Sequence, residues 1–331
     1  MDMNDKIDFV VAWVDGDDPK WQKDRDFYLP KNTDDVDNRN ARFRDWDQLK
    51  YWFRAVEKNA PWVNKIHFVT YGHLPDWLDV NNPKLHIVNH KDFIPEKYLP
   101  VFNSTAIEVH LHRIPTLSEQ FVYFNDDCYL MKPCKESDFF KKGKPVDMAK
   151  LSNVLTNQNE KYYYHLYNDY SIYTNYLSKK NILKLFFKYV NPRYGKAALH
   201  NIFNLLAKNM YFYPLHLPEP FLRSSIDKVW AENYESLDKT AKSRFRKVTN
   251  NSQALFRGYQ LITGDFYPKN RKGMVLDTRN AEYAKQMIEN FKYKYLCMSD
   301  NSDDASFEDD KNRINASFEK VFPEKSSFEI E

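Results

Sequence analysis

The residues of this chain best suited to chemistry lie close together, between Phe102 and Leu130. A strongly apolar run ends there in two adjacent carboxylates, Asp126 and Asp127, and Glu108 lies shortly before them. Hard divalent cations bind carboxylate oxygens, and a diphosphate needs cations to balance its charge. Because α/β enzymes place functional groups at the ends of buried strands, we interpret the Asp-Asp pair as a metal or phosphate site rather than a solvated turn.

The segment 105–113 has two interpretations, as a helix and as a strand. As a helix it begins with the capping box Thr105-x-x-Glu108, in which Glu108 only accepts a backbone hydrogen bond. As a strand it would place Glu108, His110 and His112 on one face, as metal ligands can lie. The Ser/Thr-rich start favours the helix, in which the two histidines point in nearly opposite directions. A zinc site is therefore not expected.

Two positions near the N-terminus have a functional and a structural interpretation. Asp15 ends an apolar run beside Trp13 and is a candidate nucleotide contact, although the Asp-Asp-Pro that follows is typical of a helix N-cap. Arg44 lies just before a predicted helix. It either clamps phosphate groups or forms a surface ion pair with Asp45 or Asp47.

Two basic residues of the second half are candidates of the same kind. His216 lies between two prolines and is either a general base or a structural histidine. Arg246 belongs to a basic run at 244–247 that is also typical of a solvated surface. The seven glycines form no phosphate-binding motif, which argues against dinucleotide dehydrogenases and P-loop kinases.

The apolar pattern predicts an α/β fold with a mainly parallel, Rossmann-like sheet and helices on both faces. Short β-branched and aromatic runs predict four strands, at Ile7–Trp13, Ile66–Thr70, Leu85–Val88 and Phe121–Phe124. An i, i+3, i+4, i+7 spacing predicts a helix over Asp45–Asn59. Ligands of such sheets gather at the C-terminal ends of the strands, so Asp15, Thr70 and the Asp-Asp pair are expected at one edge.

After residue 216 the apolar pattern predicts three helices and one short strand. The helices are Pro218–Tyr234, Ser252–Thr263 and Ser306–Phe322, and an apolar run at Tyr295–Met298 ends beside Asp300. We divide the chain into a first part of the catalytic core at 1–149, a helical insertion at 150–215, and a part at 216–331 that completes the same domain.

Residues 179–208 hold seven basic side chains and no acidic one. Apolar residues at helical spacing lie between them and predict a basic amphipathic helical pair, broken at Asn191-Pro192. Such a pair either packs on the core as an insertion or docks on an anionic membrane surface.

The bulk properties exclude several classes of protein. A length of 331 residues with 42% hydrophobic and 29% charged residues is typical of a globular protein, and a net charge of +3 gives no indication of a nucleic-acid partner. The cysteines, Cys128, Cys134 and Cys297, have no zinc spacing and cannot all pair, so reduced thiols in a cytoplasmic protein are expected. Neither a signal peptide nor a membrane span is predicted.

Four blocks of the sequence resemble the Stealth family of sugar-1-phosphate transferases. The first is IDFVVAWVDG at 7–16. The second comprises RFRD at 42–45, NAPWVNKIHFVT at 59–70, LPVFNSTAIEVHLHRI at 99–114 and FVYFNDD at 121–127. A looser third block surrounds His216 and Phe245-Arg246, and the fourth is LCMSDNSDD at 296–304, followed by FPEKSSFE at 322–329. The resemblance covers about two-thirds of the chain.

The resemblance implies transfer of a hexose-1-phosphate from a UDP-sugar to a hydroxyl of a glycan acceptor, with release of UMP. It implies catalytic carboxylates at Glu108 and Asp127, a metal site for Mg²⁺ or Mn²⁺ at Asp126 and Asp127, and a base at His216. The remaining residues that it implicates are of two kinds: Arg113 and Arg246 would face the phosphates, and donor contacts would come from Trp13, Asp15, Arg44, Asp45 and Asp300.

The family also implies a role in capsular or cell-surface polysaccharide synthesis, with a lipid-linked acceptor at the inner face of the cell membrane. Segment 179–208 would then touch the membrane. Two other classes remain open: a conventional glycosyltransferase, which releases UDP, and a non-catalytic protein that binds sugar nucleotides or glycans.

Overall fold

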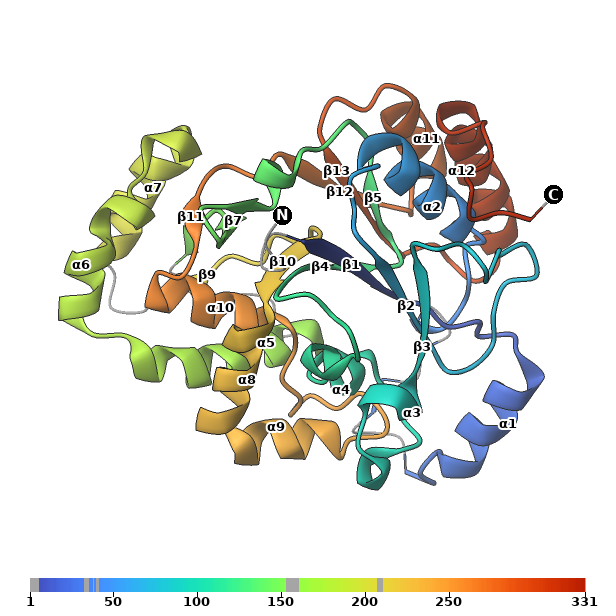
Figure 1. Ribbon diagram of the computed structural model, residues 1–331, viewed down its shortest axis with the longest axis horizontal. Helices are drawn as coiled ribbons and strands as arrows, with labels where there is room; N and C mark the ends of the chain where they lie inside the picture. Colours follow the sequence, from blue (N-terminus) through green and yellow to red (C-terminus); the bar gives the residue numbers. More distant parts are fainter. Residues whose placement is uncertain are drawn as a thin grey trace.

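The computed structural model describes residues 6–32, 36, 37, 39, 42–152, 161–206 and 211–330. At its centre lies a five-stranded sheet of order β10-β4-β1-β2-β3 (Figure 1). Neighbouring pairs among β4, β1, β2 and β3 are parallel, whereas β10 is antiparallel to β4. The bounds are β1 Ile7–Ala12, β2 Ile66–Thr70, β3 Leu85–Asn89, β4 Gln120–Asn125 and β10 Glu219–Leu222. The predicted α/β fold with a mainly parallel sheet is confirmed.

Alternation along β1 explains why both faces of this sheet are covered. Phe9 and Val11 point into one apolar core, whereas Val10 points into another. The first core is covered by α2 (Leu49–Asn59), α11 (Ala281–Glu289) and α12 (Phe307–Val321). The second is covered by α4 (Ser104–Glu108), α8 (Arg223–Glu232), α9 (Tyr234–Ala241) and α10 (Ala254–Thr263). A strand that is buried on both faces is typically a continuous apolar run, as β1 is from Phe9 to Ala12.

Two predicted helices have different bounds in the structure. The helix predicted from Asp45 begins at Leu49, so Asp45 lies in the loop before α2. Segment 105–113 is not one helix: α4 ends at Glu108, and a separate 3-10 turn, η4, covers Leu111–Arg113. Near the N-terminus, α1 (Pro19–Tyr28) has Asp18 as its N-cap, and the Asp18 carboxylate accepts from Trp21 N at 2.6 Å. The N-cap interpretation of Asp-Asp-Pro is confirmed.

The prediction of a helix from Pro218 to Tyr234 is wrong at its start. Residues Glu219–Leu222 form β10, and the helix α8 begins only at Arg223. Pro220 is compatible with this strand because β10 lies at the edge of the sheet, where a missing N–H disrupts no ladder. The antiparallel partners Glu219 and Tyr123 fix its register against β4.

Three smaller sheets surround the central one. One has the order β12-β13-β5, with β12 Gly273–Asp277, β13 Tyr295–Ser299 and β5 Cys128–Leu130. The others are β11-β7-β6 (Tyr267–Pro268, Lys144–Asp147, Phe140–Lys141) and β8-β9 (Leu151–Ser152, Tyr211–Phe212). The run at 295–298 is thus a strand, as predicted. The short helices are α3 His90–Phe93, η3 Glu96–Tyr98, η5 Glu136–Asp138 and η6 Thr174–Tyr176.

The described part of the segment between β8 and β9, residues 161–206, contains three α-helices. They are α5 (Lys161–Tyr173), α6 (Lys179–Tyr189) and α7 (Lys196–Leu205), with the 3-10 turn η7 (Pro192–Tyr194) between the last two. The predicted helical pair with its break near Asn191-Pro192 is therefore present, and Figure 1 shows α6 and α7 at one edge of the molecule, on the side away from α12. Lys208 lies outside the described residues. Across the described ranges, no helix combines the length and apolarity needed to cross a membrane.

Four buried charges hold β10 in place. Arg257 on α10 donates to Asp147 at 2.7 Å, and Arg271 donates to Glu219, the first residue of β10, at 2.8 Å. Arg257 also lies 3.6 Å from Glu219. Removing one member of such a group leaves a buried charge without its partner and costs about 3–5 kcal/mol, so the quartet fixes the start of β10 firmly.

Candidate functional site

The two adjacent carboxylates lie in the turn that joins two sheets. The central strand β4 ends at Asn125, Asp126 and Asp127 form the turn, and β5 begins at Cys128 in the smaller sheet. The turn is held from the far side by Met298 N, which donates to Asp127 O at 2.9 Å. Asn125 pairs with Ala12 at the end of β1, so the turn lies at the C-terminal edge of the parallel strands, where it was predicted.

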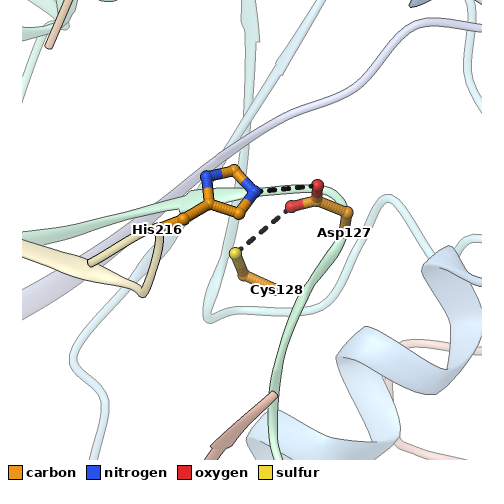
Figure 2. A group of neighbouring side chains, drawn as sticks. All are labelled: Asp127, Cys128 and His216. Carbon is orange, nitrogen blue, oxygen red and sulfur yellow. Dashed lines mark hydrogen bonds and ion pairs between the residues drawn. The ribbon is translucent and has the colours of Figure 1, made fainter. Parts of the chain in front are cut away.

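His216 is brought to this turn by β10. Because Glu219 pairs with Tyr123, continuing the antiparallel register from Glu219 towards His216 leads to the end of β4. His216 has φ 43°, in the left-handed region, which turns the chain before the strand. Its Nε2 lies 3.3 Å from Oδ2 of Asp127 (Figure 2). The sequence-predicted base and carboxylate are therefore hydrogen-bonded to each other.

The Asp127 carboxylate raises the pKa of the His216 imidazole. Burial acts to lower the pKa of His216, but the negative charge and hydrogen bond of Asp127 outweigh it and the pKa is raised, with smaller contributions from Glu219 and Glu108. An imidazole with a raised pKa is a stronger base, and Asp127 stabilises the imidazolium formed when it takes a proton.

Asp126 and Asp45 form an acidic group beside this pair. Burial and the charges of Asp127 and Asp45 raise the pKa of Asp126 to about 8. Burial and the charges of Asp47 and Asp15 raise the pKa of Asp45 to about 6. Trp13 Nε1 donates to Asp45 Oδ2 at 3.1 Å, so Trp13 and Asp45 do meet.

Glu108 occupies the opposite side of the same cluster. The N-cap of α4 is Asn103, which accepts from Thr105 N, so the capping-box interpretation of Glu108 is wrong. The Glu108 carboxylate instead accepts from Gln253 N at 3.1 Å, at the start of α10. Burial raises the pKa of Glu108, while Arg246, the Gln253 N–H, Ser104 and His216 oppose the shift.

Arg246 reaches Glu108 through a serine. Its guanidinium donates to Ser104 Oγ, and its positive charge acts on both Glu108 and Tyr123. Arg246 therefore belongs to the cluster and is not merely part of a solvated basic run.

Tyr123 lies at the centre of this group and was missed in the sequence. It is on β4 and is buried, and the charges of Glu108, Asp126 and Asp127 add to burial in raising its pKa, whereas Arg246 lowers it. In the apolar run Phe121–Phe124 its hydroxyl was the only polar side-chain atom. A lone hydroxyl at the end of a predicted strand is the signal that could have found it.

The cysteine beside Asp127 is paired. Cys128 and Cys297 form a disulfide between β5 and β13, so the expectation that the three cysteines are reduced is wrong for this pair; Cys134 is free and buried. Cys128 Sγ lies 3.2 Å from Asp127 Oδ1 (Figure 2). Asp127, Cys128 and His216 have potential metal-ligand atoms within 4.8 Å of one another. Cys128 is a poor metal ligand, however, because a sulfur in a disulfide is not a thiolate.

The oxygen donors suit a hard divalent cation. Asp45 and Asp127 are close enough to Asp126 for their charges to raise its pKa. A cation bound between these carboxylates would relieve the repulsion. Carboxylate oxygens are the ligands that Mg²⁺ and Mn²⁺ prefer. The predicted metal residues, Asp126 and Asp127, therefore fit the ion that the family resemblance implies, with Asp45 as an additional ligand candidate.

Other predicted residues have different partners. Arg44 donates to Asp300 Oδ2 at 2.6 Å and to Asp304 Oδ1 at 2.8 Å, so its ion pair is with neither Asp45 nor Asp47. This link joins the loop before α2 to the loop after β13. Asp15 N donates to His73 Nε2 at 2.8 Å, which positions Asp15 near Asp45, whose pKa it raises.

Arg113 is not brought to the cluster. It is exposed, donates to His112 Nε2 at 3.3 Å and lies over the Trp230 ring at 5.1 Å. The two histidines also have separate partners: His110 Nδ1 is 2.8 Å from Ala106 O, and His112 is 3.6 Å from Asp227. Neither arrangement is that of a zinc site.

Replacing Asp127 with Asn is expected to lower the pKa of His216. The substitution removes the largest of the contributions that raise the pKa and leaves burial, which lowers it, so the pKa of His216 should fall from its wild-type value. A histidine titration followed by NMR would measure the shift. Asp227→Asn, which alters a different aspartate–histidine pair, is the control and should leave His216 unchanged. An unaltered His216 titration in Asp127→Asn would contradict the pairing.

Two family models match the chain: conserved region 1 of the Stealth proteins at residues 5–33 and conserved region 2 at residues 42–147. A capsular polysaccharide phosphotransferase WcwK of Streptococcus pneumoniae is 40% identical, over 98% of this chain and 98% of the relative. The chain belongs to the Stealth family. The predicted resemblance is confirmed, and with it the prediction of a phosphotransferase of this family.

Two further relatives of this Stealth protein have similar names. The receptor polysaccharide phosphotransferase WefC of Streptococcus oralis is 38% identical, over 98% of this chain and 99% of the relative. The exopolysaccharide phosphotransferase cps2G of Lactiplantibacillus plantarum is 36% identical, over 98% and 96%. Among solved structures, the galactosyltransferase LgtC with donor and acceptor sugar analogues covers 93% of this chain and 95% of its own, at a TM-score of 0.41 and 11% identity, which is too distant to carry an argument.

The two Stealth regions contain only part of the site. Region 1 includes Trp13 and Asp15, and region 2 includes Asp45, Glu108 and the Asp-Asp turn. The base candidate and the arginine beside Glu108 lie beyond both regions. The candidate site of this Stealth protein therefore combines residues of the two conserved regions with His216 and Arg246 from the second half of the chain.

Proposed function

We propose that this protein transfers a hexose-1-phosphate from a UDP-sugar to a hydroxyl group of a glycan acceptor. The acceptor oxygen forms a bond to the phosphorus next to the sugar, the bond from that phosphorus to the bridging oxygen breaks, and UMP leaves with the bridging oxygen. The hydroxyl proton passes to the base. The observation that carries the proposal is the hydrogen-bonded pair of His216 and Asp127 at the end of β4, beside further carboxylates.

The residues of the cluster divide the work in this reaction. His216 takes the acceptor proton, and Asp127 orients its ring and stabilises the imidazolium. Glu108 is a catalytic carboxylate, and Arg246 beside it offers positive charge to the phosphate oxygens. Trp13 and Asp15 lie at the end of β1, where the donor nucleotide would be held.

A divalent cation is needed because the cluster is acidic. Asp45, Asp126 and Asp127 would repel a diphosphate if nothing lay between them. Mg²⁺ or Mn²⁺, held by Asp126 and Asp127, would neutralise the diphosphate and favour departure of UMP.

The arginine–aspartate link of Arg44 and Asp300 has an indirect role in this proposal. The two side chains are hydrogen-bonded to each other. We therefore propose that they hold together the loop before α2 and the loop after β13 around the donor and do not themselves bind phosphate. Arg113 is proposed to act outside the reacting centre, since its partners are His112 and Trp230.

The acceptor in this proposal is a lipid-linked glycan of a capsular or other cell-surface polysaccharide, at the inner face of the cell membrane. The names of the streptococcal and lactobacillar relatives support the glycan part. The lipid part is supported by the exposed face of α6 and α7, described below.

The nucleotide product decides between reactions. Purified protein incubated with UDP-sugars, a glycan acceptor and Mg²⁺ or Mn²⁺ is expected to release UMP, with a phosphodiester signal in the phosphorus NMR spectrum of the glycan. Chelation with EDTA should stop the release, and added Mg²⁺ or Mn²⁺ should restore it. Release of UDP would instead identify a conventional glycosyltransferase, and donor binding without release of either nucleotide across a panel of donors and acceptors would identify a binding protein.

A further inference from the structure

The outer face of α6 and α7 is apolar and exposed. Phe187 on α6 is 80% exposed, and Phe203 and Leu206 at the end of α7 are 73% and 83% exposed. The other large exposed apolar side chains of the two helices are Leu183, Leu199 and Ile202. The i, i+4 spacing of the two residues on α6, and the i, i+3, i+4, i+7 spacing of the four on or next to α7, place each set on one side of its helix. A patch of this kind marks a surface that meets a partner.

Helix α7 is packed with its polar side inwards. Asn201 is buried, donates to Ala149 O and Tyr189 O at 2.6 and 2.7 Å, and accepts from Leu151 N at 2.9 Å. Asn204, one turn further, is also buried. These hydrogen bonds fix the orientation of α7 about its axis. The apolar side of α7 therefore faces outwards as a fixed feature of the structure.

The side chains of α6 and α7 themselves carry charges of only one sign. From Tyr170 to Pro218 the sequence contains no acidic residue. The exposed basic residues of α6, η7 and α7 are Lys179, Lys180, Lys184, Arg193 and Lys196. Lys188 has another role, because its ammonium group donates to Gly264 O and Phe266 O and so fastens α6 to the body of the protein.

We propose that the outer face of α6 and α7 docks on an anionic lipid surface. Exposed Phe and Leu side chains enter the boundary between headgroups and acyl chains, and the surrounding lysines meet the negative headgroups. A nucleic acid would not require the apolar side chains, and a second copy of this chain would bring the same positive charges together. The combination of apolar centre and basic surround fits the lipid.

This inference adds a location to the proposed function, because a docked enzyme meets a lipid-linked acceptor without diffusing through bulk solution. It can fail independently of the reaction: the helices concerned carry none of the proposed catalytic residues. Vesicle binding and release of UMP with a soluble acceptor are therefore measured separately.

Co-flotation of the full chain with vesicles tests the apolar part. Wild-type protein is expected to float with vesicles containing phosphatidylglycerol and much less with pure phosphatidylcholine. Phe187→Ser and Phe203→Ser should each weaken binding about tenfold, since each removes a ring that would leave water. Phe27→Ser is the matched control: Phe27, on α1, is 81% exposed and should be neutral. Full binding by the Phe187→Ser, Phe203→Ser double variant would overturn the proposal.

Charge reversal tests the basic part. Lys180→Glu with Lys184→Glu should abolish the preference for anionic vesicles, whereas Lys91→Glu with Lys239→Glu, exposed lysines elsewhere, should preserve it. Circular dichroism and release of UMP with a soluble acceptor should be unchanged in all of these variants, which separates docking from folding and turnover. Binding to neither vesicle type, or a dimer in light scattering that Phe203→Ser dissociates, would assign this face to another partner and reject the lipid.

Discussion

Replacing His216 with Asn is expected to lower kcat by about 10²–10⁴-fold, the usual contribution of a general base. Asn is the substitution of choice because His216 has φ 43°, and Asn tolerates the left-handed region better than most residues. The Asn amide is shorter than the imidazole and does not extend to the position of Nε2, which contacts Asp127, and it cannot take a proton. The loss should therefore appear in kcat, with the thermal unfolding temperature close to that of the wild type.

His86→Gln is the matched control for this variant. His86 is also partly buried and hydrogen-bonded, its Nδ1 lying 2.9 Å from Nδ1 of His67, but it lies on β3, away from the Asp-Asp turn. Near-normal release of UMP by His216→Asn would show that another group, or water, accepts the proton. The wild-type rate should also fall as the pH drops below the raised pKa of His216, because only the neutral ring can act as a base.

Replacing Glu108 with Gln should reduce turnover by a similar factor, about 10²–10⁴-fold, while preserving the fold. The amide oxygen can still accept from Gln253 N, so the hydrogen bond that Glu108 makes at 3.1 Å is retained. The variant loses a buried carboxylate that interacts electrostatically with Arg246 and His216. Burial raises the pKa of this carboxylate and so favours its protonated form. Donor binding, measured by calorimetry, should change much less than kcat.

Glu119→Gln serves as the comparison for Glu108→Gln. Glu119 is also a carboxylate that accepts from a backbone N–H, that of Ser224 at 3.3 Å, but it is only half-buried and lies away from the Asp-Asp turn. It should keep full activity. If Glu108→Gln were as active as Glu119→Gln, the role of Glu108 would be structural, in fixing the start of α10.

Much of the first half of the fold was predictable because buried parallel strands leave a clear pattern. The four predicted strands of that half agree with the structure to within about a residue at either end, since each contains a short run that is mainly apolar and rich in β-branched and aromatic residues. The position of the Asp-Asp turn followed from the same pattern, because it directly ends β4. Local sequence was sufficient where burial was complete.

The contribution of β10 was not predictable, because it is short and leads directly into a helix. Only four residues, one of them Pro220, separate the loop of His216 from α8, and the apolar spacing of the helix extends over them. The hydrogen bond between His216 and Asp127 depends on the register of this strand. Residue spacing alone carries no information about that register.

The disulfide was missed for a related reason. Cys128 and Cys297 are separated by 169 positions, and their pairing depends on the antiparallel contact between β5 and β13. Counting cysteines showed that one had to remain single, but not that the other two would be opposite each other. The link between Arg44 and Asp300 likewise depends on a long-range contact, between the loop before α2 and the loop after β13.

The edge position of β10 also has a consequence for the time at which this enzyme becomes active. During synthesis on the ribosome, Asp127 emerges 89 positions before His216, so the growing chain carries the carboxylates of the site while its base is still missing. The base arrives only when the last strand of the central sheet is added against β4. With the roles proposed above, an unfinished or prematurely terminated chain cannot consume sugar nucleotides, and completion of the sheet acts as the starting signal for catalysis.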